Sequence, residues 1–157
     1  MPTSPIKDYL SAQEFFSGLN PKYIGFLARS AGEQQIEPNQ ILFRPGEQAH
    51  HFYLIRSGSI IMEIPALTGP TLEVQSLGPD RILGWSWLIP PYKWSFQARA
   101  EQPSTLLVFD GDAVLARCEK EPRFGYELFK RFASLMSERL EVARKKMMSQ
   151  WNPPGSC

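Results

Sequence analysis

The feature that most constrains the fold is a series of short apolar runs separated by turn residues. The runs lie at residues 35–36, 41–43, 51–56, 59–64, 71–77 and 106–109. Turn sequences such as Pro45-Gly46 and Gly78-Pro79 separate them, and turn signals at intervals of about 8–12 residues are typical of an antiparallel sandwich or barrel. Within residues 51–56, Phe52 and Leu54 face one side of the strand and Tyr53 and Ile55 the other. Both faces are therefore expected to be partly covered, as in a closed jelly roll flanked by helices.

Helices are expected on both sides of this β region. Asn20 and Pro21 have the cap and first-position chemistry of a helix, which Gly32 would end. Asp110 and Pro122 begin two further helices over about residues 110–150. Residues 1–8 and 152–157 are expected to be loose. Ser11 and Glu14 have the spacing of a capping box, which predicts a short helix at that place. We therefore predict a single mainly β domain over 1–157: an antiparallel β-barrel of the double-stranded β-helix (jelly-roll) type, about 34–109, with N-terminal helices and a long C-terminal helix.

The long C-terminal helix carries two apolar stripes. The first stripe recurs at steps of four and three residues, at Phe129, Ala133, Met136, Leu140, Ala143 and Met147. The second lies beside it, at Leu128, Phe132, Leu135 and Val142. One stripe can pack on the barrel and the other on a second chain, although a single wide stripe on its own domain is the alternative. The heptad spacing favours a homodimer through residues 124–147, with Phe129, Met136, Leu140 and Met147 in contact.

Composition excludes several classes of function. The chain has 17 basic and 16 acidic residues and a net charge of +1, so it lacks the basic stripe expected of a duplex DNA reader. It contains no apolar run of the roughly 18 residues that a membrane helix needs, and its N-terminus lacks the apolar run of a signal peptide. Its two cysteines, Cys118 and Cys157, are no disulfide framework, which fits a reducing cytoplasm.

No residue pattern predicts an enzyme. A cupin-type metal site needs a His-x-His pair, whereas His50 and His51 are adjacent and would point to opposite faces of a strand. Serines, cysteines and acids show no catalytic spacing, and Asp110 and Asp112 fit the start of a helix. We therefore expect no enzymatic activity, no metal and no resident cofactor.

The stretch LGWSWLIPPYKWSFQARA, residues 83–100, contains three of the four tryptophans. Gly84 opens it, and Trp85 to Leu88 can form one helical turn before Pro90 stops the helix. A glycine that leads into a short helix presents backbone N–H groups to an anion. An aromatic plug that closes one end of the barrel is the alternative interpretation of the same residues.

Two motifs bear a family resemblance. Residues 41–47, ILFRPGE, resemble the I-x-F-x-x-G-[DE] turn of the cyclic-nucleotide-binding domain, and residues 52–58, FYLIRSG, resemble its F-Y-[VL]-I-x-x-G strand and turn. The order of helices, about eight strands and two more helices is also similar, over about residues 15–147. The family includes catabolite-activator and Fnr-like regulators, protein kinase A regulatory subunits and gated channels, so the resemblance implies a ligand-sensing regulatory domain.

The resemblance also implies where a ligand would bind. The family's phosphate-binding cassette reads G-E-[LI]-[AS]-[LF], a spacer, then R-[AST]-A, and here Gly84 and Leu88 match at unchanged spacing. Trp85 stands at the position of the glutamate that holds the ribose, and Trp94 at that of the arginine that pairs with the cyclic phosphate. The candidate ligand-binding positions are Gly84, Trp85, Ser86, Trp87, Lys93, Trp94 and Ser95.

Both ionic contacts of the cassette are therefore replaced. Loss of a charge-assisted hydrogen bond lowers affinity by about 10- to 100-fold at the phosphate alone, so cyclic AMP is expected to bind weakly or to give way to another ligand. A ligand-free structural or interaction module, with its pocket filled by Trp85 and Trp94, is the alternative. In the ligand-sensing interpretation, the long helix would carry the output to a partner. Family members commonly add a DNA-reading helix-turn-helix after this helix; none is seen here, so no direct DNA binding is expected.

Overall fold

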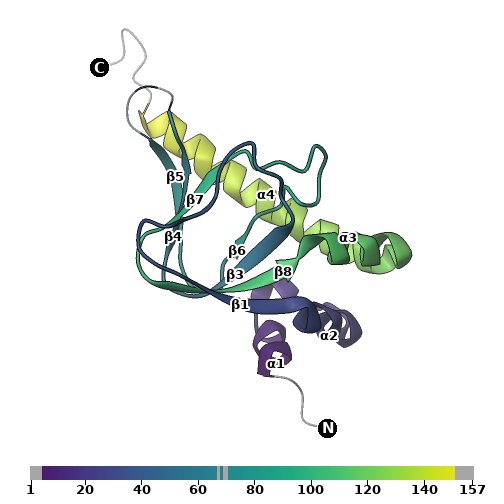
Figure 1. Cartoon of the computed structure of the whole chain (residues 1–157). Helices are drawn as coiled ribbons and strands as arrows, with labels where there is room; N and C mark the ends of the chain where they lie inside the picture. Colours follow the sequence, from purple (N-terminus) through teal and green to yellow (C-terminus); the bar gives the residue numbers. More distant parts are fainter. Residues whose placement is uncertain (1–4, 67, 69–70, 151–157) are drawn as a thin grey trace.

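The computed structural model describes residues 5–66, 68 and 71–150 (Figure 1). Three helices precede the β region: α1 (Pro5–Ser11), the 3-10 helix η1 (Glu14–Phe16) and α2 (Pro21–Ser30). The eight strands are β1 (Ala31–Ile36), β2 (Ile41–Phe43), β3 (His51–Ser57), β4 (Ile60–Ile64), β5 (Leu72–Leu77), β6 (Ile82–Leu83), β7 (Gln97–Ala100) and β8 (Ser104–Asp110). Two helices follow: α3 (Gly111–Lys120) and α4 (Pro122–Gln150). Residues 152–157, which were predicted to be loose and include Cys157, lie outside the described part of the chain.

The strands form two four-stranded antiparallel sheets, ordered β1-β8-β3-β6 and β2-β7-β4-β5. The mainly β fold with flanking helices is thus confirmed. The prediction of a closed barrel goes too far, because no strand ladder joins the two sheets within the described residues. The first sheet ends at β6, a strand of two residues, and the tryptophan-rich stretch separates it from β7 in the other sheet.

The core lies between the sheets and the helices. Phe52, Tyr53, Leu54 and Ile55 of β3 are all at least 94% buried, so both faces of this strand are covered, as their alternation predicts. Phe52 stacks on Phe109 of β8, with ring centroids 4.5 Å apart. The covered strand therefore forms the centre of the first sheet and of the core.

Three predicted helix starts are confirmed. The side chain of Asn20 accepts a hydrogen bond from the Lys22 N–H at 2.9 Å, and that of Asp110 accepts one from the Ala113 N–H at 3.1 Å. Pro122 opens α4 as expected. Each cap satisfies a backbone donor that the first turn of a helix leaves free.

The N-terminal boundaries differ from the prediction. Residues 5–11 form α1, because Leu10 is fully buried in the core and α1 packs beside α2. Between Ser11 and α2 only the 3-10 helix forms. Gly32 does not end a helix: it lies in β1, since the whole of β1 pairs antiparallel with β8 and the ladder takes its backbone groups.

The two stripes of α4 have different surroundings. Leu128 and Phe132 are fully buried and Leu135 nearly so, which places the second stripe on the body of the domain. The first stripe includes large exposed side chains, Leu140 (71% exposed) and Met147 (66%). Figure 1 shows α4 running alongside the sheet that contains β4, β5 and β7. No helix in the described part of the chain is both long and apolar enough to cross a bilayer.

Candidate functional site

The tryptophan-rich stretch connects β6 to β7 and thereby joins the two sheets. Gly84 opens it with φ of +98°, a conformation that favours glycine. One turn follows, closed by the Leu88 N–H donating to the Trp85 carbonyl at 3.0 Å. The chain then turns again, and the Tyr92 N–H donates to the Ile89 carbonyl at 2.9 Å. A single hydrogen-bonded turn is therefore present at the place where one helical turn was predicted.

Trp94 is a core side chain. It is 7% exposed and stacks on Phe43 of β2, with centroids 3.7 Å apart and ring planes 12° apart. Its backbone is fixed to the 44–47 turn, because the Trp94 N–H donates to the Glu47 carbonyl and the Gly46 N–H donates to the Trp94 carbonyl. The indole also lies against Gly84, where an added Cβ would come within 2.8 Å of Cη2. Gly84 is thus required both by its backbone conformation and by the ring above it.

Trp87 is even more deeply buried, at 1% exposed. Its Nε1–H donates to the Gly84 carbonyl at 3.1 Å, so the polar end of the indole is satisfied within the stretch itself. Its ring packs on Phe52 and meets Phe132 of α4 edge to face, at centroid distances of 4.9 Å and 5.3 Å. Trp87 joins the tryptophan stretch to β3 and α4 as part of the core.

A small hollow of about 60 Å³ remains at the cassette position, and we call it the cassette hollow. It is lined by Phe43, Met62, Gly84, Trp85, Ser86, Trp94, Ser95 and Phe96. The structure thus brings together five of the seven predicted positions, while Trp87 and Lys93 do not line the hollow. Lys93 is exposed and pairs through its backbone with Gln48. The lining residues include no cation and no acid.

Arg99, the next cation along the chain, is engaged elsewhere. Its Nε and Nη2 donate to the two carboxylate oxygens of Glu63 at 3.1 Å and 3.2 Å, and its Nη1 donates to Asn39. Gln97 donates to the same carboxylate at 2.8 Å. Burial of Glu63 opposes its ionisation, but the hydrogen bonds from Arg99 and Gln97 outweigh this and hold its pKa below the ordinary value. Arg99 therefore stabilises sheet β2-β7-β4-β5 rather than the cassette hollow.

A larger cavity of about 300 Å³, which we call the α4 cavity, lies between this sheet and α4. Met62, Trp85 and Phe96 line both it and the cassette hollow. The rest of its wall consists of Val74 and Gln75 from β5 and of Met136, Arg139, Leu140 and Ala143 from α4. The wall is mainly apolar, and Arg139 is the only ionisable residue among the described residues that line it.

Arg139 is the functional candidate that our sequence reasoning missed. It is 6% exposed, and its Nη2 donates to the Ile82 carbonyl. Its guanidinium lies over the Trp85 ring, 5.6 Å from the centroid. Among the described residues, neither Nε nor Nη1 has a hydrogen-bond partner. Burial, with repulsion from Arg81, lowers the pKa of Arg139 to about 10, so it remains charged at neutral pH.

A signal for Arg139 was present in the sequence. It lies four residues after Leu135 and three before Val142, which is on the second, inward stripe of the long helix. A cation at such a position must either extend past the edge of the domain into solvent or be buried together with the apolar stripe. The structure shows that it is buried.

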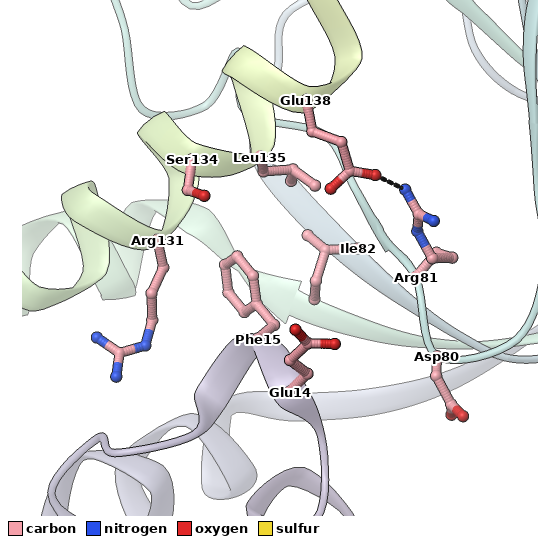
Figure 2. Close-up of a pocket in the computed structure, with 9 residues that line it drawn as sticks. All are labelled: Glu14, Phe15, Asp80, Arg81, Ile82, Arg131, Ser134, Leu135 and Glu138. Carbon is pink, nitrogen blue, oxygen red and sulfur yellow. Dashed lines mark hydrogen bonds and ion pairs between the residues drawn. The ribbon is translucent and has the colours of Figure 1, made fainter. Parts of the chain in front are cut away.

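A third hollow, of about 290 Å³, lies between η1, the turn before β6 and α4 (Figure 2). In Figure 2 the Arg81 and Glu138 side chains face one another, and they form an ion pair. Arg131 binds Glu127, and Asp80 accepts a hydrogen bond from Tyr9 at 2.6 Å. Arg81, Glu138, Arg131 and Asp80 thus each have a protein partner, whereas the buried Arg139 of the α4 cavity has two nitrogens without one among the described residues.

Comparison with known proteins identifies the family. The profile of the cyclic nucleotide-binding domain matches residues 33–121, which is more than half of the chain. The chain belongs to the cyclic nucleotide-binding domain family. The family resemblance seen in residues 41–47 and 52–58 is thereby confirmed.

Among solved structures, a putative cyclic nucleotide-binding protein from Geobacter metallireducens GS-15 is similar, with a TM-score of 0.78 and 24% identity over 88% of this chain and 99% of that one. The regulatory domain of Toxoplasma gondii PKA, solved with cAMP, has a TM-score of 0.71 and 16% identity over 85% of this chain and 49% of that one. At these identities the likeness shows the fold alone.

One curated relative is the acetyltransferase Pat of Mycolicibacterium smegmatis, 33% identical over 104 residues. The match covers 66% of this chain but only 31% of Pat, so the chain spans about a third of the length of that relative. The likeness is therefore between domains, and it concerns the regulatory fold that the family profile identifies.

Proposed function

We propose that this chain is a regulatory ligand-sensing domain whose cassette binds cyclic AMP weakly or not at all. The observation that carries the proposal is the position of Trp94, which stacks on Phe43 and lies against Gly84 where the family arginine would reach the phosphate. The second family contact is missing as well, since Trp85 replaces the ribose-binding glutamate.

Size and charge both support this proposal. The cassette hollow of about 60 Å³ is far smaller than the roughly 300 Å³ at which ligand pockets begin. Its lining offers a cyclic phosphate no cation, because Lys93 is exposed outside it and Arg99 holds Glu63. What remains for an anion is the hydroxyls of Ser86 and Ser95 and the N–H groups of one turn.

Calorimetric titration with cyclic AMP and cyclic GMP, at low and moderate salt, tests the proposal directly. We expect no saturable heat in the micromolar range for either nucleotide. A dissociation constant in the low micromolar range or below would contradict the proposal. Lys93→Gln provides the matched control: if weak binding does occur and this variant abolishes it, Lys93 has replaced the arginine.

A ligand-free structural or interaction module is the second candidate function. The close Trp94–Phe43 stack favours it, because it fills the cassette with protein side chains. The double variant Trp85→Glu with Trp94→Arg separates two possibilities for this cassette. Gained nucleotide affinity would indicate an intact cassette that lacks only its contacts, whereas lost stability without affinity would indicate that the tryptophans are core. We expect the second result.

For the output we propose a homodimer through α4. The exposed stripe supports it: Phe129, Leu140 and Met147 are 43%, 71% and 66% exposed, while Met136 is partly buried. Phe124, at the start of the predicted interface, is fully buried in its own domain, so the interface would begin further along α4.

The dimer is tested by sedimentation at high micromolar concentration, where a 17.9 kDa monomer would contradict it. Leu140→Glu should convert a dimer to monomer, because it would bury a charge at the seam. Lys145→Glu is the control, since it changes the charge of an exposed residue of the same helix outside the stripe. Equal dissociation by both variants would mean that net charge, rather than the stripe, governs assembly.

A further inference from the structure

The α4 cavity has the size and lining of a small-molecule site. Its volume of about 300 Å³ lies at the lower limit of the ligand pockets found in proteins, about 300–1,000 Å³. Trp85 and Phe96 form one side of it, and Met136 and Leu140 of α4 form another. Such sites are mainly apolar and contain a few polar groups that orient the ligand, and here the ionisable group is Arg139.

Arg139 lacks the partner that a buried cation needs. Its residue is 94% buried, and one of its nitrogens, Nη2, donates to the Ile82 carbonyl. Nε and Nη1 have no partner among the described residues. Glu138, the acid whose charge acts on Arg139, forms an ion pair with Arg81 instead. Buried charges in proteins are normally paired, so this guanidinium is the unmatched group of the cavity wall.

We propose that the α4 cavity binds an apolar molecule carrying one acidic group, and that Arg139 is the cation which recognises the acid. The inference rests on the proposed function, since it names the ligand class for a sensor whose cassette is closed. The apolar body lies against Trp85, Phe96 and Met136. The carboxylate attracts the guanidinium from within the cavity and hydrogen-bonds to Nε or Nη1 once the side chain rotates, because both nitrogens are covered by protein atoms in the unliganded state.

The acid is the ligand group that fits best for two reasons. A guanidinium nitrogen donates a stronger, charge-assisted hydrogen bond to a carboxylate than to a neutral acceptor, and Arg139 has two nitrogens without a partner among the described residues, Nε and Nη1, either of which a carboxylate can take. An additional cation would meet repulsion from Arg139 and Arg81, and a neutral ligand would leave the buried charge of the guanidinium unmatched.

The same cavity lies at the predicted output surface. Leu140 and Met136 belong both to the cavity wall and to the outer stripe of α4. A ligand that presses on these side chains changes the surface on which a second copy would pack. Binding is therefore expected to shift the monomer–dimer equilibrium, because a ligand with different affinity for two states shifts their populations.

Matched pairs of probes separate the acid from the apolar body. We would titrate the full chain with decanoate and with 1-decanol, then with 1-naphthylacetate and with 1-naphthylacetamide. Within at least one pair, the acid is expected to bind at least tenfold more tightly than its neutral counterpart. The two pairs show whether the cavity prefers an aliphatic or an aromatic body. Failure of both acids to bind up to millimolar concentration, or equal affinity of acid and neutral probe in both pairs, would overturn the proposal.

Three variants locate the binding. Arg139→Gln should weaken binding of the acid at least tenfold and leave the neutral probe unchanged. Ala143→Phe should weaken both, because it fills the cavity while keeping the cation. Arg144→Gln is the matched control, since Arg144 is an arginine of the same helix that pairs with Glu141 at the surface. If Arg139→Gln and Arg144→Gln lower the affinity for the acid equally, the acid binds elsewhere and the proposal is wrong. The same holds if Ala143→Phe lowers the affinity of neither the acid nor the neutral probe.

The same titrations distinguish this inference from the proposed function. Tight binding of cyclic AMP would contradict the proposed function, whatever the acids do. Absence of binding by both the acids and cyclic AMP would overturn only the ligand class. Folding of Arg139→Gln is checked by its urea midpoint; should it not fold, Ala143→Phe still decides whether the α4 cavity is the site. If both variants instead change only the sedimentation of the chain, the cavity belongs to a contact between copies and the ligand proposal is wrong.

Discussion

Replacing Trp94 with alanine tests whether this tryptophan is part of the core. The residue is 7% exposed and its ring stacks on Phe43, so the variant would remove a buried indole and leave a cavity between β2 and Gly84. Truncation of buried aromatic side chains costs about 3–5 kcal/mol, and the stacked pair accounts for about 0.5–1.5 kcal/mol of it. For a chain of 157 residues, each kcal/mol lowers Tm by about 2–4 °C, so the expected fall is roughly 6–20 °C.

The assay is urea unfolding followed by far-ultraviolet circular dichroism, because removal of a tryptophan changes the fluorescence signal itself. Trp85→Ala is the matched control: Trp85 is only partly buried, so its loss should cost clearly less. A loss below about 1 kcal/mol for Trp94→Ala at unchanged m would refute the reasoning, since it would place Trp94 outside the core. The same result would support a cassette in which the ring moves aside for a ligand.

Two further predictions concern the surroundings of the cassette. Gly84→Ala should lower the free energy of unfolding by about 1–3 kcal/mol, because φ is +98° and the new Cβ would meet Trp94. Gly46→Ala is the control: its φ is +88°, but its Cβ would meet no atom within 4 Å, so it should cost less. Equal losses in the two variants would argue against the clash with Trp94. The lowered pKa of Glu63 stabilises the fold above the ordinary carboxyl range, and this stability is lost as pH falls through the folded-state value. In Arg99→Met only the hydrogen bond from Gln97 would still oppose the effect of burial on Glu63, so the pKa of Glu63 should rise. Unfolding measurements should show a loss of about 3 kcal/mol at pH 7 that acid partly restores; an unchanged pH dependence would contradict this.

The sequence predicted the fold where local chemistry decides the structure. Asn20 and Asp110 are caps whose side chains bond the first turn, and a glycine turn such as Gly46 needs a positive φ. Alternation in β3 predicted burial on both faces. These features depend on neighbours in the chain, so a pattern read along the sequence contains the information.

Features that depend on distant pairing were missed. β6 is two residues long, and β7 alternates small alanines with Gln97 and Arg99, so neither resembles a typical strand in isolation. Both exist because a longer strand provides the ladder: Ile82–Leu83 pairs with β3, and β7 pairs with β4 and β2. Sheet closure depends on how these short strands end, and the turn spacing alone does not encode it.

The candidate site was predicted only in part, because it too depends on contacts between distant segments. The resemblance placed Gly84, Trp85 and Trp94 at the cassette, and these three residues line one hollow. It did not indicate that Trp87 would turn into the core, because that depends on the packing of Phe52 and Phe132. The α4 cavity needed β5 and α4 to come together, which no motif within one segment reveals.

In our proposal, Arg139 would connect the α4 cavity to the output surface proposed on α4. Neighbouring residues on a helix are separated by about 100°, so Arg139 on the inner stripe and Leu140 at the outer one are adjacent in sequence but differ in exposure, 6% against 71%. A charge on the inner stripe destabilises the empty domain, since two of its donors are unsatisfied. An acid in the α4 cavity would remove that penalty and also contact Leu140, so ligand binding and the surface of α4 would be coupled through one helical turn. The coupling requires that Arg139→Gln, measured without any ligand, be no less stable than the wild type, because it removes a buried unpaired charge. A large loss of stability in urea unfolding would show instead that Arg139 is a structural anchor for β6, and the coupling would fail.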